Sequence, residues 1–422
     1  MRFRLWLALS LCACGISWLY TVRVLGPWEH SCEIRDGIKT QMGDLYSRWV
    51  GTRELLLHHR NPYGPEVSSE IQRAFYGHPA NQPYPLPGAH LLDEQRFAYP
   101  VYAVFLLAPT VYADFVVVRW WARFFLGLLT AGCVLLCLDL LHYQPPWQVA
   151  AALVFFTLSS PQIVQGLRLE QLALLVGFLL IAGTWCVSRH HWVTSGILLA
   201  FSTIKPQMVL LPLCFFSIWT LGDWPKRWPL AASFLATLTA LILAGELLLP
   251  GWLGYFLAGI ADYRRYAPSS SVLQLILGNT FGGILGGAVV VGVLLMARKN
   301  RKEKADSRQF INTLATVFIG AILAFPLFTP FNQVMLILPV MLLLQDWKAL
   351  PRFSRIVFTG AVSWPWIVSA ILLFFKPQLN PPSQLPMRLS FLVSFTPLAL
   401  ALVLMTRSNS PSQLGNRVFE TS

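Results

Sequence analysis

The chain has 422 residues, of which 55% are apolar and only 12% are charged. Soluble domains carry about 25% charged residues, so this composition excludes an ordinary soluble protein and predicts one that crosses a membrane many times. The formal charge of +13 does not indicate nucleic-acid binding, because the basic residues gather in short loops between apolar runs, as in the cytoplasmic loops of membrane proteins. We therefore expect a lipid bilayer as a partner and no nucleic acid.

The N-terminal segment 1–25 predicts a signal-anchor transmembrane helix. Two arginines precede the apolar run Leu5 to Tyr20, which is the pattern of a signal peptide or of an uncleaved anchor. Further apolar residues up to position 25 favour the anchor. With the N-terminus in the cytoplasm, residues 26–98 form an external loop, and its unusual length predicts that it is the catalytic loop rather than a simple connection.

Residues 99–406 are expected to form the multi-span membrane domain. Its first segment, 99–113, is short and contains Pro109, so we predict a re-entrant helix that does not cross the bilayer. If one true span follows it and ends near Leu141, the most basic loops can all face the cytoplasm. This topology gives roughly twelve transmembrane helices and a cytoplasmic tail at 407–422. The later spans are predicted at about 148–165, 171–187, 192–204, 207–221, 229–249, 272–297, 309–327, 333–345, 356–374 and 388–406.

This topology separates the polar residues into two sets. The cytoplasmic loops hold mostly Lys and Arg, without a constellation of carboxylates or histidines. The external side instead combines a carboxylate, amides and cations within or beside apolar runs, so chemistry is expected there. These external candidates are Asp44, Gln171, Lys205, Gln207, Arg264, Arg265 and Asn332.

Asp44 is the candidate general base. Attack of a hydroxyl group on a sugar carbon requires a base within hydrogen-bond reach, and one carboxylate suffices when a phosphate leaves in a single inverting displacement. The alternatives are a solvated loop aspartate or the N-cap of a helix that starts near Leu45. A short amphipathic helix is predicted from Trp49 to His59.

Lys205 is the strongest candidate for binding an anion. It interrupts the apolar run Ile197 to Leu213, where a cation is costly unless it faces a cavity or an anion such as a lipid phosphate. Arg264 and Arg265 are further candidates, because guanidinium groups bind phosphate oxygens in a bidentate manner. The alternative for the arginines is that they extend towards lipid headgroups.

The external loop adds further candidates for substrate binding. Tyr46, Tyr63 and Tyr99 could stack against a sugar, although aromatic side chains near a membrane more often anchor it at the interface. Arg48 and Asn61 complete this set.

No cofactor is expected from the sequence. The four histidines of the external loop, His58, His59, His78 and His90, fit no usual zinc or calcium spacing. We therefore expect a metal-independent protein, with a divalent metal left as an alternative. The chain also lacks a phosphate-binding GxxxxGK loop, a nucleophile elbow and an HExxH motif.

Several short motifs occur in an order that resembles glycosyltransferase family 87, a GT-C type family that includes polyprenol-phosphate-mannose-dependent alpha-mannosyltransferases. The resemblance implies an all-α polytopic membrane protein with a GT-C-like helix bundle, a polyprenyl-phosphate sugar as donor, and a catalytic aspartate that maps onto Asp44. The motifs are Gly43-Asp44-Leu45-Tyr46, Asn61-Pro62-Tyr63, Phe97-Ala98-Tyr99-Pro100, Ser195 to Ala200 before Lys205-Pro206-Gln207, and Thr329-Pro330.

Three positions depart from the family pattern. Where the family has Gly-Gln before its central helix, this chain has Glu170-Gln171. Where the family has a second proline after Tyr-Pro, this chain has Val101. Phe331-Asn332-Gln333 stands where the family often has a Tyr or His. These departures leave the sugar and the acceptor open more than the type of reaction.

The sequence therefore predicts an integral-membrane hexosyltransferase. It would move a hexose, with mannose as the first candidate, to a glycan, glycolipid or protein acceptor on the periplasmic or external side. A bacterial inner membrane is favoured over an ER membrane, because retention signals are lacking and the loops are compact. A transporter or flippase of lipids or lipid-linked sugars is the main alternative, and a non-catalytic scaffold is a third.

Overall fold

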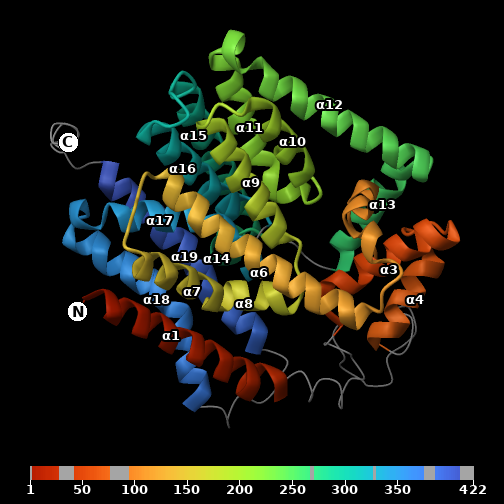
Figure 1. Ribbon diagram of the computed structural model, residues 1–422, viewed down its shortest axis with the longest axis horizontal. Helices are drawn as coiled ribbons and strands as arrows, with labels where there is room; N and C mark the ends of the chain where they lie inside the picture. The colour runs from red at the N-terminus through yellow and green to blue at the C-terminus, as the bar shows by residue number, and fades with distance from the viewer. Residues whose placement is uncertain are drawn as a thin grey trace.

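The computed structural model describes residues 2–27, 42–76, 95–266, 270–326, 329–374 and 385–408. All elements within these ranges are helical (Figure 1). The α-helices are α1 Arg2–Tyr20, α3 Gly43–His58, α4 Pro65–Tyr76, α5 Val104–Leu107, α6 Phe115–Leu140, α7 Trp147–Ser159, α8 Pro161–Arg168, α9 Ala173–Ser188, α10 Trp192–Ser202, α11 Pro206–Gly222, α12 Trp224–Leu248, α13 Trp252–Tyr266, α14 Val272–Leu277, α15 Asn279–Lys299, α16 Arg308–Ala324, α17 Ile337–Gln345, α18 Arg352–Phe374 and α19 Leu385–Ser408. The remaining helical segments are η1 Thr21–Leu25, η3 Val101–Ala103, η4 Ala108–Thr110, η5 Pro330–Leu336 and η6 Trp347–Ala349.

Four of the described helices are long and apolar enough to cross a bilayer. They are Leu5–Leu25, α6, α12 and α15, with 21, 26, 25 and 21 residues. Large apolar side chains are exposed on all four of them, such as Trp18 (64%), Trp120 (67%), Leu247 (86%) and Phe281 (73%). Lipid would cover these surfaces, which makes the chain an all-helical membrane protein. The count of roughly twelve spans stays a prediction.

Two predicted spans are interrupted in the structure. The predicted span at 148–165 breaks at Ser160, where α7 and α8 meet at an angle of 61°, because the residue before Pro161 is restricted to an extended conformation. The predicted span at 272–297 breaks at Gly278, whose φ of +80° does not fit a helix. With the bent α7–α8 pair included, the described residues contain up to five candidate spans.

The helix predicted at Trp49 to His59 begins earlier in the structure. It extends over Gly43–His58 rather than Trp49 to His59, and its N-cap residue is Met42. Asp44 therefore lies in the first turn of α3 and is not the N-cap residue. Helices α3 and α4 pack against each other beside the N-terminal end of α6 (Figure 1).

The segment after this loop is short. Its helical part, Val101–Thr110, has ten residues and thus a length of about 15 Å, half of what a crossing requires. Tyr102 near its start donates a hydrogen bond to the carbonyl oxygen of Thr203 at 3.2 Å, which ties the segment to the loop after α10. The re-entrant path predicted for residues 99–113 stays a prediction.

Polar interactions gather at both ends of α6. At its C-terminal end, Arg189 pairs with Asp139 at 2.5 Å, and Gln345 donates to the carbonyl oxygen of Leu141 at 2.8 Å. At its N-terminal end, Arg119 and Arg123 contact residues beside α3 and the start of α9. Arg119 and Asp139 are 20 residues apart on α6, so the two polar regions are separated by about 30 Å along the helix.

Candidate active site

Asp44 is held in place through its backbone at the start of α3. Its amide donates a hydrogen bond to the carbonyl oxygen of Leu169 at 2.9 Å. One turn later, Arg48 donates from Nη1 to the carbonyl oxygen of Asp44 at 2.5 Å. The first bond joins α3 to the turn between α8 and α9, and the second lies within α3, so that together they fix the backbone of Asp44.

Gln171, in the turn between α8 and α9, connects Asp44 to Lys205. Its Nε2 atom donates to Oδ2 of Asp44, and its Oε1 atom accepts from Nζ of Lys205 at 3.4 Å. Because the side chain is only 3% exposed and its backbone amide donates to the carbonyl oxygen of Gly166 at 2.8 Å, its orientation is fixed. One amide group thus holds both a carboxylate and an amine.

Lys205 lies in the turn between α10 and α11 and is 6% exposed. Its amine donates to Oδ1 of Asn332 at 2.9 Å and lies 4.8 Å from the centre of the Phe331 ring. Asn332 is oriented by a hydrogen bond from its Nδ2 atom to Oγ1 of Thr329 at 2.6 Å. No ion pair joins Lys205 to a carboxylate within the part of the chain that the structure describes.

The two ionisable groups of this network are perturbed in opposite directions. Burial raises the pKa of Asp44 above its usual value, although the positive charges of Arg48 and Lys205 act against this change. Burial also lowers the pKa of Lys205 to about 7, and the charge of Arg48 adds to this effect. Asp44 is partly exposed, whereas Gln171, Lys205 and Asn332 are buried, so Asp44 is the accessible member of the network.

Arg48 and Tyr99 form the wall beside Asp44. The guanidinium group of Arg48 lies 4.9 Å from the centre of the Tyr99 ring and also donates to Oγ of Ser47 at 2.7 Å. Burial raises the pKa of the Tyr99 hydroxyl group, although the nearby charge of Arg48 acts against this change; the Asp44 carboxylate adds to the rise. Two residues predicted to bind substrate therefore lie next to the predicted base.

Three other predicted residues make mainly structural contacts. Tyr46 packs edge-on against Phe115, with ring centres 4.9 Å apart. Asn61 accepts a hydrogen bond from the backbone amide of Tyr63 at 2.9 Å, which is a local turn contact. The Tyr63 hydroxyl group donates to the carbonyl oxygen of Tyr99 at 2.6 Å. Substrate contact by Tyr46, Asn61 and Tyr63 stays a prediction.

Of the remaining predicted residues, one lies apart from this network and the others lie outside the described side chains. Gln207 is exposed on the first turn of α11 and takes no part in the hydrogen bonds around Asp44 and Lys205. Arg264 and Arg265 belong to α13, but their side chains lie outside the described residues. The same is true of His78 and His90.

Sequence reasoning missed an arginine–carboxylate cluster beside the network. The side chain of Glu170 is fully buried and accepts hydrogen bonds at Oε1 from Nε of Arg123 at 2.7 Å and from Nε of Arg119 at 3.3 Å. The two arginines lie four residues apart on α6, so they share one helix face. That spacing, together with a single carboxylate next to Gln171, was the available signal.

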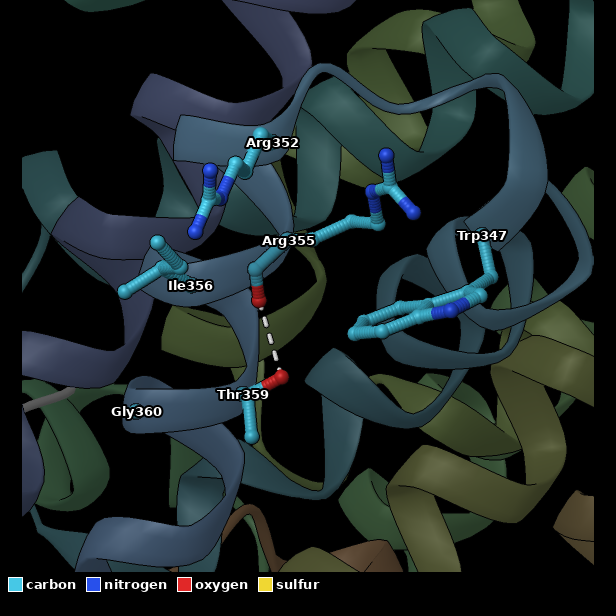
Figure 2. A pocket seen from close by; sticks show the side chains of 6 residues that line it. All are labelled: Trp347, Arg352, Arg355, Ile356, Thr359 and Gly360. Carbon is cyan, nitrogen blue, oxygen red and sulfur yellow. Dashed lines mark hydrogen bonds between the residues drawn. The ribbon is translucent and has the colours of Figure 1, made fainter.

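A surface pocket of about 580 Å³ lies elsewhere, lined by Trp347, Arg352, Arg355, Ile356, Thr359 and Gly360 (Figure 2). It adjoins the C-terminal end of α17, which contacts the C-terminal end of α6 through Gln345. The pocket is therefore at the opposite end of α6 from Asp44. Its lining includes neither a carboxylate nor a histidine, so it lacks a group that could act as a general base.

Comparison with known proteins identifies the family. The family model for glycosyltransferase family 87 matches residues 97–330, which is more than half of the chain. The match includes Gln171 and Lys205, whereas Asp44 precedes it and Asn332 follows it. No curated protein and no solved structure matches the chain. On the strength of the family match, this all-helical membrane protein belongs to glycosyltransferase family 87.

Proposed function

We propose that the protein transfers a hexose, with mannose as the first candidate, from a polyprenyl phosphate to an acceptor hydroxyl group. One observation carries this proposal: the side-chain amide of Gln171 holds the Asp44 carboxylate on one side and the Lys205 amine on the other. A transfer of this kind needs a base for the incoming hydroxyl group and a positive charge for the departing phosphate. The network provides one of each.

Asp44 is the general base in this proposal. It takes the proton of the acceptor hydroxyl group while the hydroxyl oxygen forms a bond with the anomeric carbon. The raised pKa of Asp44 makes its carboxylate a stronger proton acceptor than an ordinary aspartate. Because Asp44 is partly exposed, an acceptor can approach it from outside the buried network.

Lys205 stabilises the leaving group. As the bond between the anomeric carbon and the phosphate oxygen breaks, its electron pair stays on the phosphate, whose negative charge grows. Lys205 has no carboxylate partner within the described residues. A phosphate anion would supply the negatively charged partner for its buried amine. A bound anion would also raise the pKa of Lys205 and keep it protonated.

The positive charge of Lys205 lets the reaction proceed without a cofactor. We expect transfer to continue in the presence of EDTA, and a loss of activity that Mg²⁺ or Mn²⁺ restores would show that a metal takes part. The sugar, and the choice among a glycan, glycolipid or protein acceptor, would be set by contacts around Asp44 and Tyr99. Arg48 lies over the Tyr99 ring beside Asp44, so these two residues are the first candidates for contact with the sugar.

The proposed orientation places Asp44 on the external side. The loop 26–98 would be the catalytic loop, and the basic loops at the other end of α6 would face the cytoplasm, as the positive-inside rule requires. A bacterial inner membrane fits this arrangement, with the active site on its periplasmic face.

Purified protein incubated with a panel of polyprenyl-phosphate sugars tests the proposal. We expect consumption of one donor and a new glycosidic product with inverted anomeric configuration. The alternative, a transporter or flippase of lipid-linked sugars, predicts movement of the intact donor across proteoliposomes without a covalent product. Flux without product would therefore contradict the transferase proposal.

A further inference from the structure

Glu170 is attached to α6 by a paired arginine contact. Its Oε1 atom accepts from Arg119 and Arg123, and Arg123 also donates from Nη2 to the carbonyl oxygen of Arg168 at 3.0 Å. The turn that carries Glu170 is therefore bound to α6 through both its side chain and its backbone. A carboxylate shared by two guanidinium groups forms charge-assisted hydrogen bonds, which are stronger than neutral ones.

The same turn meets the start of α3. Leu169 accepts the hydrogen bond from the Asp44 amide at 2.9 Å. The second oxygen of Glu170, Oε2, is buried without a hydrogen-bond partner and lies where a side chain at Gly43 would be, since a Cβ atom there would be 2.0 Å from it. A carboxylate in this place also interacts favourably with the positive N-terminal end of the helix dipole.

Glu170 has a backbone conformation that is unfavourable for glutamate. Its φ angle is +49°, in the left-handed region that favours glycine and is unfavourable for other residues. Glutamate therefore occupies this position at a cost in backbone energy, and its side chain is completely buried. Contacts with α6 and α3 offset this cost.

We infer that Glu170 is a positioning residue: the Arg119–Glu170–Arg123 cluster holds the 168–171 turn between α6 and α3, and thereby fixes Gln171 against Asp44. This inference rests on the proposed function of Asp44. Glu170 itself is buried behind Gly43 and does not contact the reacting atoms. Its effect is on the placement of the base, so its loss lowers the rate of the chemical step more than the binding of the donor.

Glu170→Gly separates positioning from a purely local structural role. Glycine adopts a positive φ angle without cost, and the loss of the carboxylate removes the contacts to both arginines. We expect kcat to fall by about tenfold or more while the KM for the donor changes by less than about twofold, because misplacement of a catalytic group affects mainly kcat. Glu170→Gln keeps an acceptor oxygen for the arginines and is expected to recover part of the lost kcat.

Asp139→Asn is the matched control. Asp139 accepts hydrogen bonds from Trp185 and Arg189 at the other end of the same α6–α9 helix pair, far from Asp44. We expect this variant to keep the kcat of the wild-type protein. All kcat values are compared per mole of monodisperse protein after size-exclusion chromatography, so that a loss of folded protein is not counted as a loss of rate.

Wild-type kcat in Glu170→Gly would overturn the inference, and so would equal losses of kcat in Glu170→Gly and Asp139→Asn. Asp44→Asn is measured in parallel. If Asp44→Asn is inactive but Glu170→Gly turns over normally, only the positioning role fails. If Asp44→Asn retains wild-type turnover, the proposed function itself fails.

Discussion

The side-chain amide of Gln171 donates a hydrogen bond to the carboxylate of Asp44, 127 positions earlier in the chain. The same amide accepts a hydrogen bond from Lys205, so the acidic and basic groups of the site share one neutral contact. Neutralising either charge is therefore expected to affect the other group through Gln171.

Gln171→Glu tests this shared contact. The change removes the amide donor and places a second carboxylate beside Asp44, which raises the pKa of Asp44 further by like-charge repulsion. We expect a loss of kcat/KM of about 10- to 100-fold and a shift of the acidic limb of the pH profile to higher pH. Gln309→Glu is the same change at an exposed position next to Arg308, which contacts Gln345 near the C-terminal end of α6, and it is expected to leave both unchanged.

The pH profile of the wild-type protein reports on Lys205. Its pKa of about 7 means that the free protein loses this positive charge as the pH rises through about 7. The raised pKa of Asp44 means that the base becomes protonated, and inactive, at a higher pH than an ordinary aspartate would. We therefore expect a bell-shaped dependence of kcat/KM on pH, since this parameter reports the ionisation of the free enzyme.

Lys205→Arg should move the alkaline limb to higher pH, because a guanidinium group stays protonated, although kcat will be lower. Lys205→Met removes the charge and should abolish turnover at every pH. A wild-type profile that stays flat between about pH 6 and pH 9 would contradict a role for a lysine of lowered pKa.

Much of the site could be predicted from the sequence. Asp44, Gln171, Lys205 and Asn332 were each placed on one side of the membrane domain by loop charges, and the structure joins them in one network. The signal was the presence of polar groups at the edges of apolar runs, where burial makes them costly.

Side-chain direction could not be read in the same way. Gln207 is two residues after Lys205 and belongs to the same motif, yet residues two apart on a helix point to different faces, and Gln207 is exposed. Glu170 was missed because its partners Arg119 and Arg123 are about fifty positions away. The spacing of the two arginines was a local signal, but their pairing with Glu170 arises from tertiary packing and could not be read from it. The break at Ser160 had a local signal in Pro161, which the continuous apolar run obscured.

Tyr63→Phe is expected to destabilise the region around α3 and α4. The Tyr63 hydroxyl group ties the turn after α3 to the backbone of Tyr99 at 2.6 Å, and its loss should cost about 1 kcal/mol of stability. Thermal unfolding in detergent measures this cost. Tyr112→Phe removes a hydroxyl group from a side chain that is 86% exposed and should leave Tm unchanged, and equal Tm values for the two variants would contradict the expectation.

Gly43→Ala is expected to separate α3 from the 168–171 turn. Gly43 has a φ angle of +66°, and a Cβ atom would lie 2.0 Å from Oε2 of Glu170, so both the backbone and the packing oppose alanine. Activity should fall at least tenfold and Tm should decrease. Gly127→Ala, in the middle of α6 with no atom within 4 Å of the new methyl group, should keep full activity and an equal or higher Tm.

The turnover of Asp44→Asn with the preferred polyprenyl-phosphate sugar tests the central claim most directly. Asparagine keeps the size of the side chain and an oxygen that can accept the hydrogen bond from Gln171, but it cannot take a proton from the acceptor. We predict monodisperse protein, retained donor binding and a loss of turnover of at least about 100-fold. Near-wild-type turnover in this variant would contradict the assignment of Asp44 as the general base.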